Sequence, residues 1–343
     1  MTSSLHIQSF SCRRKQQGLS LIELMISITL GLIILSSLTT LFLNQNRARS
    51  ELDKSNRMID NGRYALELIS ENLRLAGFYG TYTLVTAAPA ATPDPCNLTT
   101  LTTAATNLDV LRHHVQGYNA AAQNSQIASL PATCGLTYTA GSATSLKAGS
   151  DILVLRRAST STVTAAAAVA NTVYLQISEC STDTVAYQVA TSAFTTFHDK
   201  NCTTVANLRP FLTQIYFISP DNQVGDGIPT LKRRELDSTG AFVTTPLVEG
   251  VEYMQVDYGL DTGSDGAADS YIAAPTLAQW PSVMSVKINI IARNTEATSG
   301  YTDTKSYVLG SAGTFGPFND GYKRHAYTQV VRLVNPSSRR EVP

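Results

Sequence analysis

The chain has 343 residues, 43% of them hydrophobic and 15% charged, which is enough for a sizeable folded core. It contains 26 basic and 26 acidic residues, and this balance excludes the strongly positive field of a general nucleic-acid-binding protein. The charge is uneven, because residues 1–18 hold Arg13, Arg14 and Lys15 and no acidic residue.

An apolar run follows this basic segment from Leu19 to Leu43, and its only charged residue is Glu23. As a helix the run would be about 37 Å long, enough to cross a hydrocarbon layer of about 30 Å. The preceding basic residues predict a cytoplasmic N-terminus. A secretory signal has its small-residue cleavage site after the apolar core, whereas here the small residue, Gly18, comes before it. Cleavage at Gly18 would leave the helix on the mature protein.

Glu23 is unusual in such a segment, because a charged acid inside a bilayer costs about 2.5–3.5 kcal/mol and normally has a partner. Cleavage after Gly18 would create a free amine at Leu19, one helical turn from Glu23. That amine, on the same chain or on a neighbour, could neutralise the carboxylate when helices pack side by side. The alternative is a plain signal anchor with Glu23 at the membrane interface.

The segment GLSLIEL (18–24) resembles the processing signal of type IV pilins and type II secretion pseudopilins, usually GFTLIEL. The resemblance implies that a prepilin peptidase cleaves the Gly18–Leu19 bond and methylates the new amine of Leu19. It also implies that Glu23 is the carboxylate used in assembly. Leu19 replaces the usual phenylalanine, and an aliphatic residue is acceptable there. Residues 1–18 are therefore predicted to be a cleaved leader, and residues 19–43 a membrane and fibre-core helix.

Residues 44–76 continue as an amphipathic stalk helix. Apolar residues recur every seven positions at Leu52, Ile59, Leu66 and Leu73. Gly77 is a predicted C-terminal cap, so one helix is expected from about 19 to 76, with Gly31 and Gly62 as potential bends. Four repeats are few for a coiled coil. We therefore expect the stalk to lie on the protein's own globular domain and the apolar half to protrude.

Residues 77–343 are predicted to form a β-rich globular domain. Runs of β-branched and alternating apolar residues predict strands at 151–158, 172–178, 211–218, 251–260, 285–293 and 327–334. Two segments rich in Ala, Thr, Ser and Pro, 86–107 and 158–171, predict exposed loops. The predicted fold class is α+β, with a long N-terminal helix packed on an antiparallel sheet.

The four cysteines beyond the leader lack CxxC spacing and predict two disulfides rather than a zinc site. Three pairings are open. We favour Cys96–Cys134 and Cys180–Cys202, because each closes a short local loop. These bridges imply an oxidising compartment, and the alternative is four reduced thiols in the cytosol.

Several segments of the domain resemble the PilW family of minor pilins. They are DILVLRR (151–157), the stretch 246–271, Trp280 before a strand, and GPFNDGYKRHAYTQVVRLVN (316–335). The resemblance runs with gaps from the leader almost to the end of the sequence. It implies the pilin-like fold already predicted from the helix and the strands.

Asp261, Asp265 and Asp269 are spaced like positions 1, 5 and 9 of a calcium loop, with Gly266 at position 6. Two departures from that pattern are Gly263 at position 3 and Ile272 at position 12. An acidic turn between two strands is the alternative. Asp221 and Asp226 could add acid from a neighbouring loop.

Other candidate sites are weaker. His113 and His114 follow a strand-like run, would face opposite sides of a strand, and are predicted to lie on the surface. The segment 198–200 is expected at a loop tip. No nucleophile elbow, P-loop or dinucleotide-binding turn is present, so the sequence predicts no enzyme.

The resemblance implies a minor pilin that takes part in type IV pilus assembly, in an initiation or tip complex. The implied partners are the inner membrane, prepilin peptidase, other minor pilins, the major pilin, a PilY-type tip adhesin and the pilus assembly platform. The implied location is the inner membrane, with a single pass and a periplasmic domain, and later the extracellular pilus. The alternative function is a GspJ-like minor pseudopilin of type II secretion.

Overall fold

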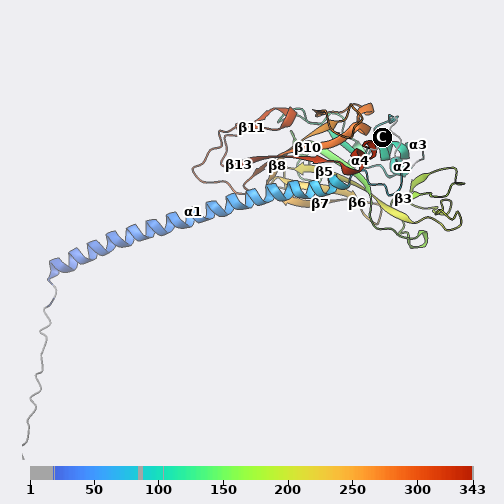
Figure 1. Ribbon diagram of the computed structural model, residues 1–343. Coiled ribbons are helices and arrows are strands. Elements are labelled where there is room, and N and C mark those ends of the chain that lie inside the picture. Colours follow the sequence, from blue (N-terminus) through green and yellow to red (C-terminus); the bar gives the residue numbers. More distant parts are fainter. Residues whose placement is uncertain (1–17, 19, 84–87, 103, 342–343) are drawn as a thin grey trace, which may run out of the picture. The chain divides into compact units, whose positions relative to one another are not determined.

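The computed structural model describes residues 18, 20–83, 88–102 and 104–341, with the backbone alone for residues 100 and 104–107. The chain divides into two compact units, Met1–Asp53 and Lys54–Pro343. Helix α1, Leu21–Leu75, includes residues of both units (Figure 1). One continuous helix was expected over nearly this range, and its type and extent are confirmed.

In the first unit, the side chains from Leu21 to Ser50 are all exposed. The large apolar residues of the predicted membrane segment are among them, with Leu21 76% and Ile33 66% exposed. The helix of this unit therefore presents apolar surface from Leu21 to Leu43, as expected for a segment that packs against lipid or other helices.

The part of α1 in the second unit packs on the globular domain, as predicted. Its buried residues are Met58, Gly62, Ala65, Leu66, Ile69, Ser70 and Leu73. Their spacing of three or four residues follows the helical repeat. The helix ends where expected, because Gly77 adopts φ +71°, the left-handed conformation that suits glycine after a helix.

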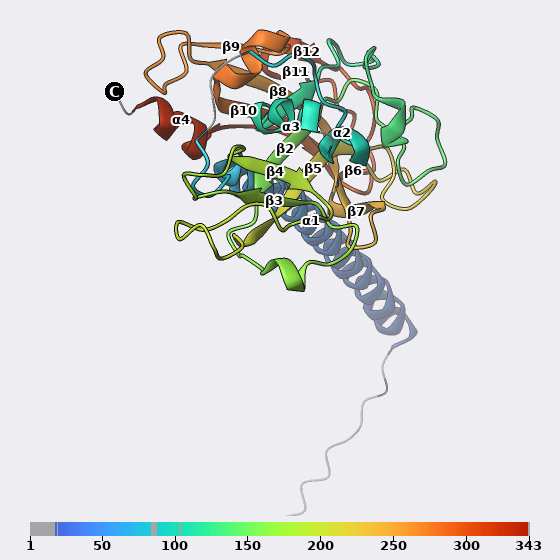
Figure 2. The ribbon, with the colours of Figure 1, turned by 90° about the vertical axis from the view of Figure 1, so that its right-hand side faces the viewer.

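Three antiparallel sheets make up the rest of the second unit (Figure 2). The seven-stranded sheet contains β1 Val115–Tyr118, β2 Ile152–Ala158, β3 Tyr174–Ile177, β4 Tyr187–Ala190, β5 Leu208–Ser219, β6 Thr230–Leu236 and β7 Phe242–Glu249. The four-stranded sheet contains β8 Val251–Leu260, β9 Ser270–Ile272, β10 Val283–Arg293 and β13 Arg324–Arg332. The third sheet pairs β11 Tyr307–Val308 with β12 Thr314–Phe315.

The long strand β5 organises the larger sheet, whose order is β1-β2-β5-β3-β4 with β6 and β7 continuing from β5. The smaller sheet has the order β13-β10-β8-β9. Residues from α1 and from both larger sheets share one core, in which Ile69 lies with Tyr216 and Met254. The stalk is thus part of the domain core, which explains why its apolar stripe extends to its end.

All six predicted strands are confirmed, but seven further strands were not predicted, namely β1, β4, β6, β7, β9, β11 and β12, and neither were the helices α2, α3 and α4. The predicted loop over 86–107 contains α2, Leu98–Thr102, and the start of α3, Ala104–Arg112. The strand-like run before His113, LDVLR (108–112), is the end of α3 and not a strand. Val110 and Leu111 from this helix are buried. The remaining helices are α4 Val334–Arg340 and the single turns η1 Ala132–Cys134, η2 Ala165–Ala167, η3 Leu277–Ser282 and η4 Gly310–Ala312.

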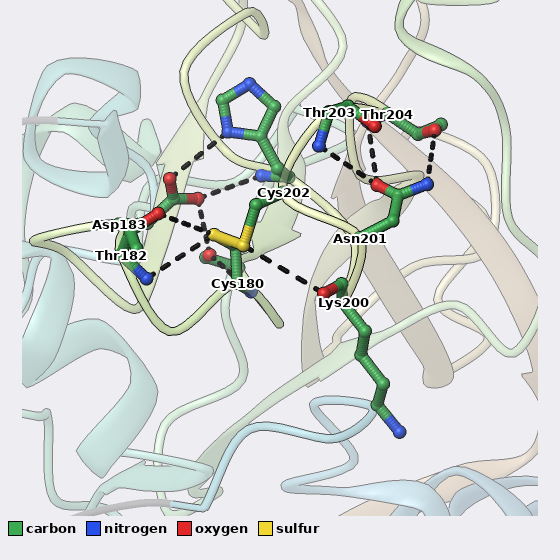
Figure 3. Close-up of a disulfide and its surroundings, with 10 residues drawn as sticks. Cys180, Thr182, Asp183, Lys200, Asn201, Cys202, Thr203 and Thr204 are labelled. Carbon is green, nitrogen blue, oxygen red and sulfur yellow. Dashed lines mark hydrogen bonds and ion pairs between the residues drawn. A yellow bond between two sulfur atoms is a disulfide. The ribbon is translucent and has the colours of Figure 1, made fainter.

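Two disulfides join Cys96 to Cys134 and Cys180 to Cys202, which are the pairs that short loops favour. The second links the segment between β3 and β4 to the segment between β4 and β5, so that β4 lies within a covalently closed loop (Figure 3). Two side chains hold the turns beside it. The Thr182 hydroxyl lies 3.0 Å from Cys180 Sγ, and Asn201 Oδ1 accepts the backbone amide of Thr204.

Candidate functional site

The N-terminal signal is described at Gly18 and from Ser20 onward, whereas Leu19 lies outside the described residues. Gly18 is exposed, and a Cβ placed on it would have no heavy atom within 4 Å. Cleavage at Gly18–Leu19 and methylation of Leu19 therefore stay predictions. The exposure of Gly18 is compatible with access by a peptidase.

The carboxylate of Glu23 bonds to the start of its own helix. The backbone amide of Ser20 donates to Glu23 Oε2 at 2.9 Å, and the amide of Leu24 donates to the Ser20 carbonyl at 3.1 Å. Ser20 is thus the N-cap and Glu23 the third helical residue, which is the carboxylate half of a capping box. The Ser-x-x-Glu spacing at residues 20–23 is the sequence signal for this cap.

Hydroxyl groups in the apolar segment are satisfied within the helix. Ser27 donates to the Glu23 carbonyl at 2.7 Å, and Thr39 donates to the Leu35 carbonyl at 2.8 Å. A hydroxyl that bonds one turn back leaves no donor for a lipid environment to satisfy. An 18-residue window of α1 has a mean hydropathy of 2.2, and none of it is buried within the protein. By length and composition, this is a candidate membrane span.

In the predicted calcium loop, the three carboxylates bond to other groups of the protein. Asp261 accepts the amides of Ser264 and Gly266 and pairs with Arg340 at 3.1 Å. Asp269 accepts the amides of residues 262 and 263, and Asp265 accepts the amide of residue 267. Among the described residues, the carboxylates of the three aspartates do not all lie within 4.8 Å of one another.

The described carboxylates of this loop are not gathered around one point, and calcium binding stays a prediction. Calcium requires several oxygen ligands around one point, and here an arginine already neutralises Asp261. Hydrogen bonding and the Arg340 charge outweigh burial and hold the pKa of the Asp261 carboxyl below its usual range. The contacts are those of an acidic turn, which was the alternative reading.

His113 and His114 are buried, with 0% and 2% exposed, so their prediction as surface residues is wrong. They follow a helix whose end turns them into the core. His113 Nδ1 lies 2.8 Å from the Asp109 carbonyl, and His114 Nε2 lies 2.8 Å from the Val283 carbonyl. Since a carbonyl can only accept, each nitrogen carries the proton. Burial lowers the pKa of His113 to about 3 and that of His114 to about 4.

Two side-chain groups superficially resemble reactive sites. Asp183 beside the second disulfide accepts Ser178 Oγ at 2.5 Å and lies 3.1 Å from His198 Nδ1 (Figure 3). The serine bonds to the carboxylate and not to the imidazole, so this is no nucleophile and base pair. Asp94 lies with Cys96 and Cys134 within 4.8 Å, but these sulfurs form a disulfide and are not metal ligands.

Comparisons with protein families identify two parts of the chain. A model described as Type IV Pilus-assembly protein W (PilW) matches residues 215–335, and one described as the prokaryotic N-terminal methylation motif matches residues 13–39. Together the two matches support a type IV pilus minor pilin of the PilW family. The PilW match extends from within β5 to just beyond β13 and so includes the four-stranded sheet.

The matches point to a structural pilus component, and the apolar helix with its methylation motif fits a membrane-anchored pilin. Among solved structures, the chain is similar to a type IV-like pilin from Thermus thermophilus. The two are 11% identical, the match covers 82% of this chain and 98% of that chain, and the TM-score is 0.35. A comparison with curated proteins gives no match.

Proposed function

We propose that this PilW-family minor pilin is processed by prepilin peptidase and joins other minor pilins in an initiation or tip complex of the type IV pilus. The observation that carries the proposal is the single acid, Glu23, at the start of an exposed apolar helix on a chain with a PilW match. Cleavage after Gly18 removes the leader, and Leu19 becomes a methylated N-terminus.

Helix packing is the proposed mechanism of assembly. Before assembly, the segment 19–43 spans the inner membrane with the N-terminus in the cytoplasm and the domain in the periplasm. The disulfides Cys96–Cys134 and Cys180–Cys202 suit that oxidising compartment. During assembly, the apolar helices bundle and Glu23 meets the amine of Leu19 on a neighbouring chain. The Ser20 amide, at 2.9 Å, is a local partner for this carboxylate until then.

The proposed partners follow from this mechanism. They are prepilin peptidase, the pilus assembly platform, other minor pilins, the major pilin and a PilY-type tip adhesin. The second candidate function is a GspJ-like pseudopilin in a type II secretion fibre, which would use the same N-terminal chemistry. The PilW match over residues 215–335 favours the pilus.

Processing is tested by the variant Gly18→Ala, with Gly31→Ala as the matched control in the same helix segment. The wild type and the control should lose residues 1–18 when they are expressed with prepilin peptidase, and Gly18→Ala should keep them. Intact mass separates the two forms. A trimmed Gly18→Ala protein would contradict the cleavage site. Recovery of the wild type from sheared pili supports the pilus, whereas a secretion defect with normal pili in a deletion strain supports the second candidate.

A further inference from the structure

A cavity of about 330 Å³ opens on the second unit beside the Cys96–Cys134 disulfide. Its volume lies near the lower end of the range of about 300–1,000 Å³ that small-molecule pockets occupy. The loop before α2, the end of β1, the loop after β1 and the chain before η3 together form its walls. These segments are distant from the assembly helix in sequence, and no step of the proposed function uses them.

The rim of the cavity is fixed by covalent and polar contacts. The disulfide ties the loop before α2 to η1. Asp94 accepts the backbone amide of Cys96 at 3.0 Å and the hydroxyl of Thr133. The position of the Asp94 carboxylate is therefore set before any ligand binds, which lowers the entropy lost on binding.

The Tyr118 hydroxyl, a hydrogen-bond donor of the cavity wall, is oriented by two buried side chains. The buried guanidinium of Arg156 donates to Gln116 Oε1 at 2.7 Å, and Gln116 Nε2 donates to Tyr118 Oη at 2.7 Å. Because Tyr118 Oη accepts from Gln116, its own proton is free to donate. Burial is the main cause that raises the pKa of Tyr118, so the hydroxyl keeps that proton at physiological pH.

One residue of the cavity wall carries an acceptor without a partner. Asn119 lines the cavity, but its Oδ1 is shielded from solvent and has no hydrogen-bond partner among the described residues. A ligand in the cavity would therefore bond to Asp94 and Tyr118 rather than to this oxygen. Trp280, Pro131 and Pro275 supply apolar wall on the remaining sides.

We propose that this cavity binds one ring of a neutral saccharide. A sugar ring offers a hydroxyl donor for Asp94, an acceptor for Tyr118, and C–H groups for the walls formed by Trp280 and the prolines. The charge of Asp94 has a counterpart in the buried Arg156, whose charge acts on both Asp94 and Tyr118. This balance favours an uncharged ligand over a cation. The site would add glycan recognition to a pilus component, and binding itself does not depend on assembly.

The test uses the full chain, because Trp280 is its single tryptophan and lines the cavity. The protein is purified in a detergent whose head group contains no sugar, since a glycoside detergent would compete. Neutral mono- and disaccharides are added while tryptophan emission is recorded. At least one should give a saturable change, whereas the open-chain polyol sorbitol should not. A panel without any saturable response overturns the proposal, as does saturation by lysine methyl ester alone.

Variants locate the binding. Ala274 is an exposed cavity residue, and Ala278 is an exposed alanine that does not line the cavity. Ala274→Leu fills the space and should weaken binding at least about tenfold, whereas Ala278→Leu should leave it unchanged. Tyr118→Phe removes the donor and should weaken binding by about tenfold. Unchanged affinity in Ala274→Leu, or equal loss in the two leucine variants, contradicts binding in this cavity.

Discussion

The ring of Tyr327 on β13 lies directly against Gly62 of α1. A Cβ placed on Gly62 would lie 2.4 Å from Tyr327 Cε2, closer than real Cβ atoms approach a neighbour. The sequence reading treated this glycine as a potential bend, but it lies within the continuous helix α1. Its function is close approach of the helix to the sheet, and the ring of Tyr327 occupies the space that a side chain would need.

Gly62→Ala should therefore destabilise the domain. Overpacking costs about 1–3 kcal/mol, which outweighs the gain of about 1 kcal/mol in helix propensity. The free energy of unfolding is measured by chemical denaturation, with Trp280 emission as the signal. Gly31→Ala is the matched control, because no heavy atom would lie within 4 Å of its new Cβ in the described structure. Equal stability of the two variants would contradict the close-approach argument.

The stalk shows what the sequence could and could not predict about the fold. Apolar spacing identified the helix and the burial of Leu66 and Leu73, because a helix with one apolar stripe must cover that stripe. Leu52 belongs to the same predicted stripe but is 65% exposed. The same spacing could not show which side chain covers Gly62, since Tyr327 comes from the last strand of the chain. Contacts between distant segments leave no local pattern, and strands β6 and β7 were missed because polar and charged residues interrupt them.

Glu23 bonds to the Ser20 amide, and we propose that it also pairs with the amine of a neighbouring chain; the variant Glu23→Gln distinguishes the two roles. The amide oxygen of glutamine can still accept from the Ser20 amide, so the helix start should be kept. The charge is lost, so pairing with the amine of a neighbouring chain should fail. We expect normal processing and recovery in sheared pili reduced by about tenfold or more, as one lost charge pair of about 1.5–3 kcal/mol implies.

Recovery of Glu23→Gln is measured by immunoblotting of sheared pili against the amount in the membrane. Glu23→Ala removes both the charge and the acceptor, and it serves as the comparison. If glutamine assembles like the wild type while alanine does not, the carboxylate acts as a helix cap and the charge-pairing mechanism is wrong.

Arg324 holds together three acidic residues from different parts of the second unit. Its side chain is 1% exposed and bonds to Glu252 at 2.6 Å, Asp303 at 3.1 Å and Asp320 at 2.6 Å. Its guanidinium also lies 3.9 Å from the centre of the Phe318 ring. These contacts attach the connection between β10 and β13 to β8.

Removing this arginine should be strongly destabilising. Arg324→Met would leave buried carboxylates without their main partner, and breaking such a network costs about 3–5 kcal/mol. The control is Arg332→Met on the same strand, whose side chain is 54% exposed and pairs with Glu341. A change within about 1 kcal/mol is expected there. Equal midpoints of denaturation for the two variants would rule out a stabilising role for the buried network.

The candidate site was predictable to the extent that its signals are local. The run 18–24 was recognisable because the N-terminal methylation motif lies within consecutive residues. The spacing of Asp261, Asp265 and Asp269 also looked local, yet the partner that decides its chemistry is Arg340 on the last helix. The surface prediction for His113 and His114 rests on the lack of an acidic metal-ligand partner at nearby positions and on a strand-like run before them. The run is the end of helix α3, and both side chains are buried.

The buried histidines predict a pH-dependent stability. Burial lowers the pKa of His114 to about 4, whereas an unfolded histidine has a pKa of 6.5. Below pH 6.5 the unfolded chain therefore binds a proton at His114 that the folded chain does not. The free energy of unfolding then falls by about 1.4 kcal/mol for each unit that the pH is lowered. His113 acts in the same direction, since burial lowers its pKa to about 3.

His114→Gln isolates this effect, because its amide can still donate to the Val283 carbonyl and does not titrate. Burial raises the pKa of Asp151 to about 8, and this shift changes stability with pH in the opposite direction. Because Asp151 is present in both the wild type and the variant, its contribution cancels when their free energies of unfolding are subtracted. Relative to the wild type, the variant should gain about 2 kcal/mol in free energy of unfolding between pH 7.5 and pH 5. Denaturant titrations at both pH values measure that difference. A difference that stays constant with pH would show that His114 titrates normally in the folded protein, in conflict with its burial.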